Sequence, residues 1–213
     1  MNQLLRFIFY RVIVRLVVLV VLGLNVRHRQ KLPENGPAIL VANHNSHLDT
    51  MVLMTLLPPR LLSIAQPVAA VDYFLRNPLL AWFALKVVGI LPIKRERENR
   101  DDDPLLPCYE ALAKKQILIF FPEGSRGEPE KLSDFKGGIA RLSEKFPEVP
   151  VIPILLHGLG KALPKGELLP VPFFCDVFVG DALFGTAGRT TFMRQLNQRM
   201  KQLAGEGTFA AWE

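Results

Sequence analysis

The stretch AILVANHNSHLD, residues 38–49, changes from an unbroken apolar run into a run of polar residues. Ala38 to Asn43 is typical of a short buried strand, and Ser46 to Leu57 is typical of a helix that ends before the Pro58-Pro59 pair. Polar groups that follow a strand and open a helix lie at the carboxyl end of that strand, where α/β proteins usually bind their ligands. We therefore expect an α/β protein with a functional site at this point.

Segments typical of strands and of helices alternate along the rest of the chain. The strand-like segments are residues 61–66, 90–93, 116–121, 151–156 and 173–179, and the helical ones are 79–88, a helix starting at Pro104, 138–146 and a closing helix with one apolar face from Phe192 to Leu203. This alternation predicts an α/β fold in which a largely parallel sheet is flanked by helices. No internal repeat or low-complexity linker divides the chain, so we expect a single domain after the turn at residues 35–37.

The amino-terminal segment, residues 4–24, is apolar apart from Arg6, Arg11 and Arg15. Its longest uninterrupted run, Leu16 to Leu24, is shorter than the ~20 apolar residues that cross a bilayer. In a helix, the second and third of these arginines would share one face and the first would lie on the other side. The pattern favours a helix that lies in the membrane interface or inserts partly, over the alternative of a buried helix in a soluble protein.

The formal net charge of +6 is concentrated beside this apolar segment. Residues 1–40 contain six cations and one acid: Arg6, Arg11, Arg15, Arg27, Arg29, Lys31 and Glu34. A basic cluster next to an apolar helix favours an anionic lipid surface, and we find no motif for nucleic acid, the other partner that a basic protein suggests. We expect residues 1–30 to anchor the chain at the cell (cytoplasmic) membrane and residues 31–213 to form a domain that faces the cytosol.

The overall composition excludes two classes of protein. With 49% hydrophobic and 22% charged residues among 213, the chain is neither disordered nor a membrane protein with several spans. Cys108 and Cys175 are the only cysteines, and two isolated thiols give neither a disulfide framework nor a metal-binding spacing.

His44 and Asp49 are the first candidates for chemistry. Ser46 is a favourable helix N-cap and Asp49 stands three positions later, so both residues fit a capping box. Capping alone leaves His44 unexplained, whereas a carboxylate that holds the imidazole in one tautomer would make it a general base. A metal site of His44, His47 and Asp49 is a further alternative, but no second cluster of ligands completes it, and we expect neither a metal nor another cofactor.

Two further polar stretches follow apolar strands. Residues 121–126, FPEGSR, combine a proline and a glycine that turn the backbone out of the sheet with Arg126, whose planar guanidinium suits a phosphate. Residues 89–95, GILPIKR, place Lys94 and Arg95 at the end of a strand. Taken singly, each stretch also fits a solvated loop.

Together the three stretches resemble the lysophosphatidate (1-acyl-sn-glycerol-3-phosphate) acyltransferase family of the glycerolipid acyltransferase superfamily. His44 and Asp49 match its His-x4-Asp signature, residues 121–126 match its Phe-Pro-Glu-Gly-[Ser/Thr]-Arg block, and residues 89–95 and 149–153 look like its second and fourth blocks. The resemblance implies a glycerol-3-phosphate acyltransferase-like fold, with His44 as general base and Asp49 as its partner. It assigns Arg95, Glu123, Gly124, Ser125 and Arg126 to the acceptor, with no metal.

The activity that the resemblance implies is transfer of a fatty acyl group from acyl-CoA or acyl-carrier protein to the free hydroxyl of 1-acylglycerol-3-phosphate, giving phosphatidate. Alternatives are the same transfer to another lysophospholipid, a non-catalytic lipid-binding module, and a hydrolase. No Gly-x-Ser-x-Gly elbow supports an acyl-serine route, and an activated thioester does not require one. Backbone amides near Gly124 and Gly137, or the side chain of Lys136, are candidate donors to the oxyanion.

Overall fold

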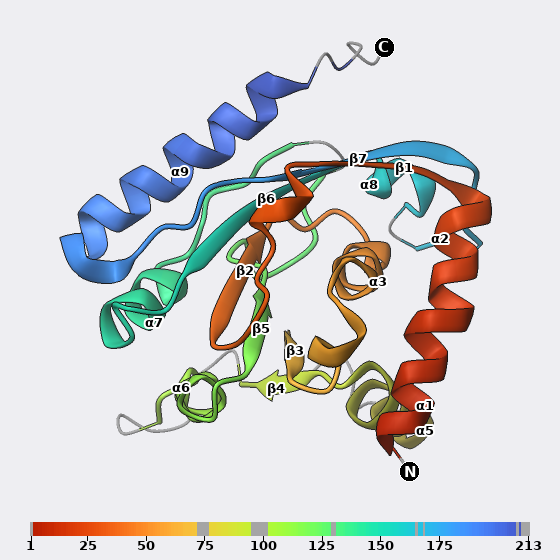
Figure 1. Ribbon diagram of the computed structural model, residues 1–213, viewed down its shortest axis with the longest axis horizontal. Helices are drawn as coiled ribbons and strands as arrows, with labels where there is room; N and C mark the ends of the chain where they lie inside the picture. Colours follow the sequence, from red (N-terminus) through yellow and green to blue (C-terminus); the bar gives the residue numbers. More distant parts are fainter. Residues whose placement is uncertain are drawn as a thin grey trace.

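The computed structural model describes residues 2–71, 77–94, 102–128, 131–164, 166–167, 169–207 and 209. Within these residues a seven-stranded sheet has the strand order β1-β7-β6-β2-β5-β3-β4 (Figure 1). The strands are β1 (Leu22–Arg27), β2 (Ala38–Ala42), β3 (Ala65–Ala70), β4 (Leu91–Ile93), β5 (Ile117–Phe120), β6 (Val151–His157) and β7 (Phe173–Val179). Every neighbouring pair is parallel except β6 and β7, so the predicted α/β fold with a largely parallel sheet is confirmed.

Helices cover both faces of the sheet. One face packs against α3 (His47–Leu56) and a helical run made of α1 (Asn2–Ile8), the π-helical η1 (Phe9–Val14) and α2 (Arg15–Val21). The other face packs against α6 (Leu106–Ala113), α7 (Gly138–Lys145) and α9 (Arg189–Glu206). Strand β2 is buried along its whole length, with alternate residues in the two cores, which explains its continuous apolar sequence.

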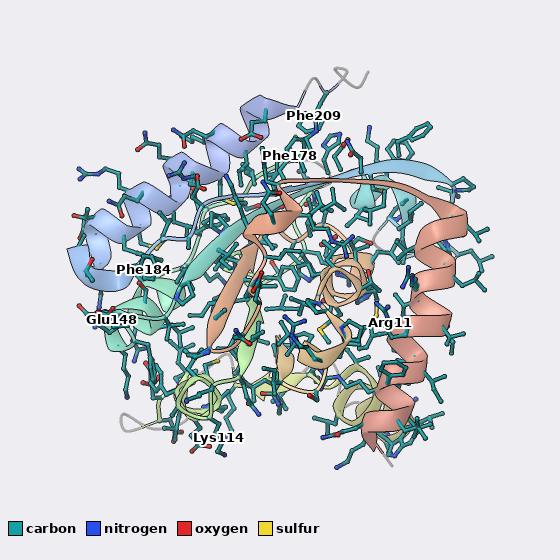
Figure 2. The ribbon with its side chains drawn as sticks, viewed as in Figure 1. Arg11, Lys114, Glu148, Phe178, Phe184 and Phe209 are labelled. Carbon is teal, nitrogen blue, oxygen red and sulfur yellow. The ribbon has the colours of Figure 1, made fainter. Side chains whose placement is uncertain are left out.

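The remaining elements are short. They are η2 (Arg29–Lys31), η3 (Pro59–Leu61), α5 (Pro78–Phe83), η4 (Ala84–Val88), α8 (Leu159–Ala162) and η5 (Gly185–Ala187). Figure 2 shows the side chains that fill the space between the sheet and the helices, including Phe178 and Phe209, whose rings meet edge to face at 5.8 Å.

Most predicted elements are present, and one predicted strand is wrong. The segment at residues 61–66 was expected to be a strand, but the two prolines at 58–59 start the 3-10 turn η3 instead, and β3 begins only at Ala65. Conversely, strand β1 (Leu22–Arg27) was not predicted. It follows the apolar helix without a turn residue and pairs with β7. Residues 1–30 therefore contribute one strand to the sheet.

The helical run at Asn2–Val21 presents an apolar face to the exterior. The exposed apolar side chains on it are Leu4, Leu5, Phe7, Ile8, Val12, Ile13, Leu16 and Val20. Within the described part of the chain, no single helix has both the length and the hydropathy needed to cross a membrane.

Three parallel strands bring the polar stretches of the sequence together. Strands β6, β2 and β5 are neighbours in the sheet, so their carboxyl ends lie at one edge. Asn43 joins two of these ends, because its side-chain amide donates to the carbonyl oxygen of Leu156 (2.9 Å) and its Oδ1 accepts from the amide of the same residue (2.7 Å). The loop after β5 is joined to β2 by a bond from the amide of Gly127 to the carbonyl oxygen of His44 (3.0 Å).

Candidate active site

The junction between β2 and α3 contains the predicted capping box. Ser46 has extended backbone geometry and its Oγ accepts from the amide of Leu48 (3.3 Å), while Asp49 accepts from the amide of Ser46 (2.8 Å). The Ser46 hydroxyl also donates to the carbonyl oxygen of Leu163 (2.9 Å), so the cap ties the start of α3 to the segment after β6. The capping interpretation is therefore correct for both residues.

The same aspartate also holds His44. Nδ1 of His44 lies 2.9 Å from Oδ2 of Asp49, and this one oxygen accepts from the backbone amides of Asn45 (2.6 Å) and Ser46 (2.8 Å) as well. Asp49 is fully buried; burial raises the pKa of its carboxyl, and its hydrogen bond from His44 and the two amides opposes that rise. With Nδ1 facing the carboxylate, Nε2 is the ring nitrogen left to exchange a proton with a substrate.

Phe121 supports the other side of the imidazole. The two rings stack with centroids 4.2 Å apart and planes 23° from parallel, and the His44 side chain remains 19% exposed. Phe121 is the first residue of the motif at residues 121–126, and the motif alone predicts no role for its side chain. Its role could have been recognised only from the knowledge that β5 is the neighbour of β2, since the two residues stand at the ends of adjacent strands.

Glu123 lies buried behind this loop, with 5% of its surface exposed. The pKa of its carboxyl is raised to about 7: burial and the negative charge of Asp49 raise it, and the backbone amides of His44 and Ser133 oppose part of the rise. A group in this setting is only partly ionised near neutral pH. Glu123 therefore lies on the inner side of the loop, while Ser125 is exposed at its surface.

Gly124, which follows Glu123, has a conformational role. Gly124 has φ +75°, which disfavours any other residue, and an added Cβ would come within 2.7 Å of Nζ of Lys136. Its amide donates to the carbonyl oxygen of Phe121 (3.1 Å) within the turn. The Gly124 amide is thus engaged within the turn, and Nζ of Lys136 lies beside this glycine.

Positive charge lies beside His47. Burial, together with the positive charges of Arg126 and His44, lowers the pKa of His47 to about 4, so His47 is neutral at pH 7 and Arg126 lies near its ring. Together with Lys136 above Gly124, Arg126 makes this edge of the sheet suited to an anionic group. Lys94 is exposed at the end of β4, whereas Arg95 lies outside the described residues.

No group of three His, Cys, Asp or Glu side chains in the described ranges is arranged to hold a metal ion. Asn43, which joins β2 to β6, is the residue of the first motif whose role the sequence analysis missed.

Comparison with known proteins adds to this geometry. The family model described as Acyltransferase matches residues 23–157, which contain most of β1, all of β2 to β6 and the three polar stretches of the sequence. The chain belongs to the acyltransferase family. The match begins at residue 23, within β1, so this strand belongs to the matched region.

Several relatives of this acyltransferase-family chain have names that describe one activity. The chloroplastic 1-acyl-sn-glycerol-3-phosphate acyltransferase of Arabidopsis thaliana is 33% identical over 145 residues, or 68% of this chain and 38% of that protein. The 1-acyl-sn-glycerol-3-phosphate acyltransferase of Helicobacter pylori is 32% identical over 124 residues, or 58% of this chain and 49% of that one. The chain thus matches less than half the length of these relatives.

The fold also matches a solved structure. The crystal structure of the 1-acyl-sn-glycerophosphate acyltransferase PlsC from Thermotoga maritima superposes with a TM-score of 0.75 over 99% of this chain and 81% of that one, at 18% identity. At this identity the match concerns the fold, which is that of an acyltransferase-family domain.

The raised pKa of Glu123 predicts a specific pH dependence of stability. Because the folded protein binds this proton more tightly (pKa about 7) than the unfolded chain does (ordinary value 4.5), the contribution of the group is fully present below pH 4.5 and is lost as the pH rises through 7. Replacing Glu123 by Gln removes the titration, so the stability of Glu123→Gln relative to the native protein should increase by roughly 3 kcal/mol between pH 4.5 and 8. Urea unfolding at several pH values measures this, with the exposed Glu148→Gln as control; parallel pH profiles for native protein and Glu123→Gln would contradict it.

Proposed function

We propose that the protein transfers a fatty acyl group from acyl-CoA or acyl-carrier protein to the free hydroxyl of 1-acylglycerol-3-phosphate, which gives phosphatidate. The observation that carries the proposal is the His44–Asp49 pair at the edge of the sheet, 2.9 Å apart and beside a cationic loop, in a chain of the acyltransferase family. The names of the Arabidopsis and Helicobacter relatives support this choice of acceptor.

In the proposed reaction His44 acts as general base. Nε2 takes the hydroxyl proton while the acceptor oxygen attacks the thioester carbonyl carbon and forms a tetrahedral intermediate. The carbon–sulfur bond then breaks, the ester forms, and the thiol leaves with the proton that the imidazolium returns. Asp49 stabilises the imidazolium and maintains its orientation throughout. No acyl-enzyme is needed, because the thioester is already activated.

The cationic side chains are proposed to bind the negative charges of the acceptor phosphate and of the oxyanion. Arg126 offers a planar pair of donors to the phosphate of the acceptor, and Lys94 would add charge from the end of β4. Arg95, which lies outside the described residues, is assigned to the same phosphate by the motif alone. Lys136, whose ammonium group lies over Gly124, is the proposed donor to the oxyanion. Glu123, Gly124 and Ser125 shape the loop that presents these groups.

The exposed apolar face of the helical run is proposed to dock on a membrane. Leu79, Leu80, Trp82 and Leu85 on α5 and η4 continue this face, and Phe9 of the run meets Phe83 edge to face at 5.2 Å. A soluble protein rarely leaves so many neighbouring apolar side chains in water. Arg11 and Arg15 stand on the same run and suit anionic lipid headgroups. We propose that the protein works at the cytoplasmic side of the cell membrane, with this face in the lipid interface.

Removal of the base is expected to abolish most of the activity. His44→Ala should lower kcat for acyl transfer by about 10²–10⁴-fold, the usual contribution of a general base, and Asp49→Asn should cause a smaller loss because the ring loses the carboxylate that orients it. Thiol release from acyl-CoA in the presence of lysophosphatidate measures this, with the surface substitution His28→Ala as control. Unchanged turnover in His44→Ala would indicate a lipid-binding module, and thiol release without an acceptor would indicate a hydrolase.

Loss of the positive charge of Arg126 is expected to weaken the binding of one of the two substrates. Arg126→Ala should raise the KM for lysophosphatidate by about 10- to 100-fold, the range for charge-assisted hydrogen bonds, while the KM for the acyl thioester changes less than threefold. Steady-state kinetics with lysophosphatidate and with choline, ethanolamine and glycerol lysolipids measure this, and Arg189→Ala is the control. Equal increases in both KM values would refute the assignment, and a preference for a diester headgroup would redirect it to another lysophospholipid.

A charge in the centre of the apolar face should disrupt docking. Leu16 is 61% exposed, and Leu16→Asp should weaken binding to vesicles that contain anionic phospholipid by about tenfold or more, because a carboxylate replaces apolar area in the interface. Leu106→Asp is the matched control, since Leu106 is 53% exposed on α6, across the sheet from the helical run (Figure 1). Cosedimentation with vesicles gives the result; equal binding by both variants would rule out this face.

A further inference from the structure

The inward side of the helical run contains two buried polar side chains, Arg6 and Tyr10. Only 9% of Arg6 and none of Tyr10 is exposed, although the outward side of the same run is apolar. Burial of a guanidinium is unfavourable, and it lowers the pKa of Arg6. A leucine would pack at either position without that penalty, so the hydrogen bonds that these two side chains make require an explanation.

Their partners lie in the turn before β4 and at the start of β3. Tyr10 donates its hydroxyl to the carbonyl oxygen of Val88 (3.1 Å), the last residue of η4. Arg6 donates through Nη2 to the carbonyl oxygen of Ala65, the first residue of β3. Its guanidinium also lies directly against Gly89, where an added Cβ would come within 2.5 Å of Cζ and 2.6 Å of Nη1. Gly89 has φ +77° and ends η4 in the left-handed conformation.

This turn determines where β4 lies. Strand β4 is three residues long and, among the strands that the structure describes, stands at the edge of the sheet and pairs with β3 alone, from Val68–Leu91 to Ala70–Ile93. So short an edge strand has few hydrogen bonds of its own, and the turn that precedes it and the start of β3 are the parts that Arg6 and Tyr10 hold. Because β4 is parallel to β3 and β5, its carboxyl end, with Lys94, lies toward the same edge as His44.

We propose that Arg6 and Tyr10 are positioning residues for acceptor binding, which they serve by linking the outward-facing apolar helix to the turn that sets β4 and its cationic end. This inference rests on the proposed function for the identity of the acceptor. It gives the amino-terminal run a second role, since a helix that faces lipid on one side fixes part of the substrate site with the other.

Two single substitutions test the link. Tyr10→Phe removes only the hydroxyl, and Arg6→Met replaces the guanidinium by an apolar chain of similar reach. The controls are Tyr109→Phe, which removes the hydroxyl of a buried tyrosine on α6, and Arg60→Met, which removes a guanidinium that also donates to a backbone carbonyl (Glu34, 3.1 Å). Each protein is assayed in detergent for both KM values, and amide hydrogen exchange is followed in residues 90–94.

We expect Tyr10→Phe and Arg6→Met each to raise the KM for lysophosphatidate by about 2- to 10-fold, the effect of one net hydrogen bond, with the KM for acyl-CoA unchanged within twofold. Exchange of residues 90–94 should become faster in these two variants and not in the controls. A purely structural role would reduce the active fraction and leave the ratio of the two KM values unchanged, and that result would overturn the proposal.

The exchange measurement also separates this proposal from the proposed function. If the native protein transfers no acyl group to lysophosphatidate, the proposed function fails, and exchange alone then decides whether the helix holds β4. If Arg6→Met does not fold, Tyr10→Phe still decides the question. Unchanged protection of residues 90–94 in Tyr10→Phe would show that the contact with Val88 does not position the strand.

Discussion

The site depends on one buried oxygen atom. Oδ2 of Asp49 accepts from the imidazole of His44 and from the backbone amides of Asn45 and Ser46, and the residue has no exposed surface. A carboxylate removed from water needs donors in place of its hydration, and these three groups supply them to Oδ2. The consequence is that the start of α3, the end of β2 and the orientation of the histidine are fixed by one interaction and cannot vary independently.

This shared use explains how the sequence could be interpreted in two ways. Asp49 fits a helix cap together with Ser46 and also an acid that orients His44, and its position in the sequence allows both roles. In the structure they coincide, because the loop from residue 44 to 46 curls around the carboxylate so that amides and ring meet on one side. Spacing alone cannot reveal such a loop conformation, although it does place the aspartate within reach.

The sheet shows which features of a sequence determine a fold. Strands buried on both faces, such as β2 and β5, have uninterrupted apolar sequences and were predicted closely. Strand β1 was not, because Leu22–Arg27 continues an apolar helix and its partner is distant in the chain. The stacking of Phe121 on His44 and the burial of Arg6 depend on which elements become neighbours, and that order is a property of the assembled sheet.

The pairing of β1 with β7 has a consequence for how the chain acquires its structure. Leu22 lies opposite Phe173, so the first strand has no partner until most of the chain has been synthesised. Closing such a distant contact is entropically costly and slow compared with forming the central strands. On the ribosome, the amino-terminal helix therefore emerges long before the sheet can receive the strand attached to it. During that interval the apolar side chains that the run later packs into the core, such as Val14 and Val18, have no sheet to cover them.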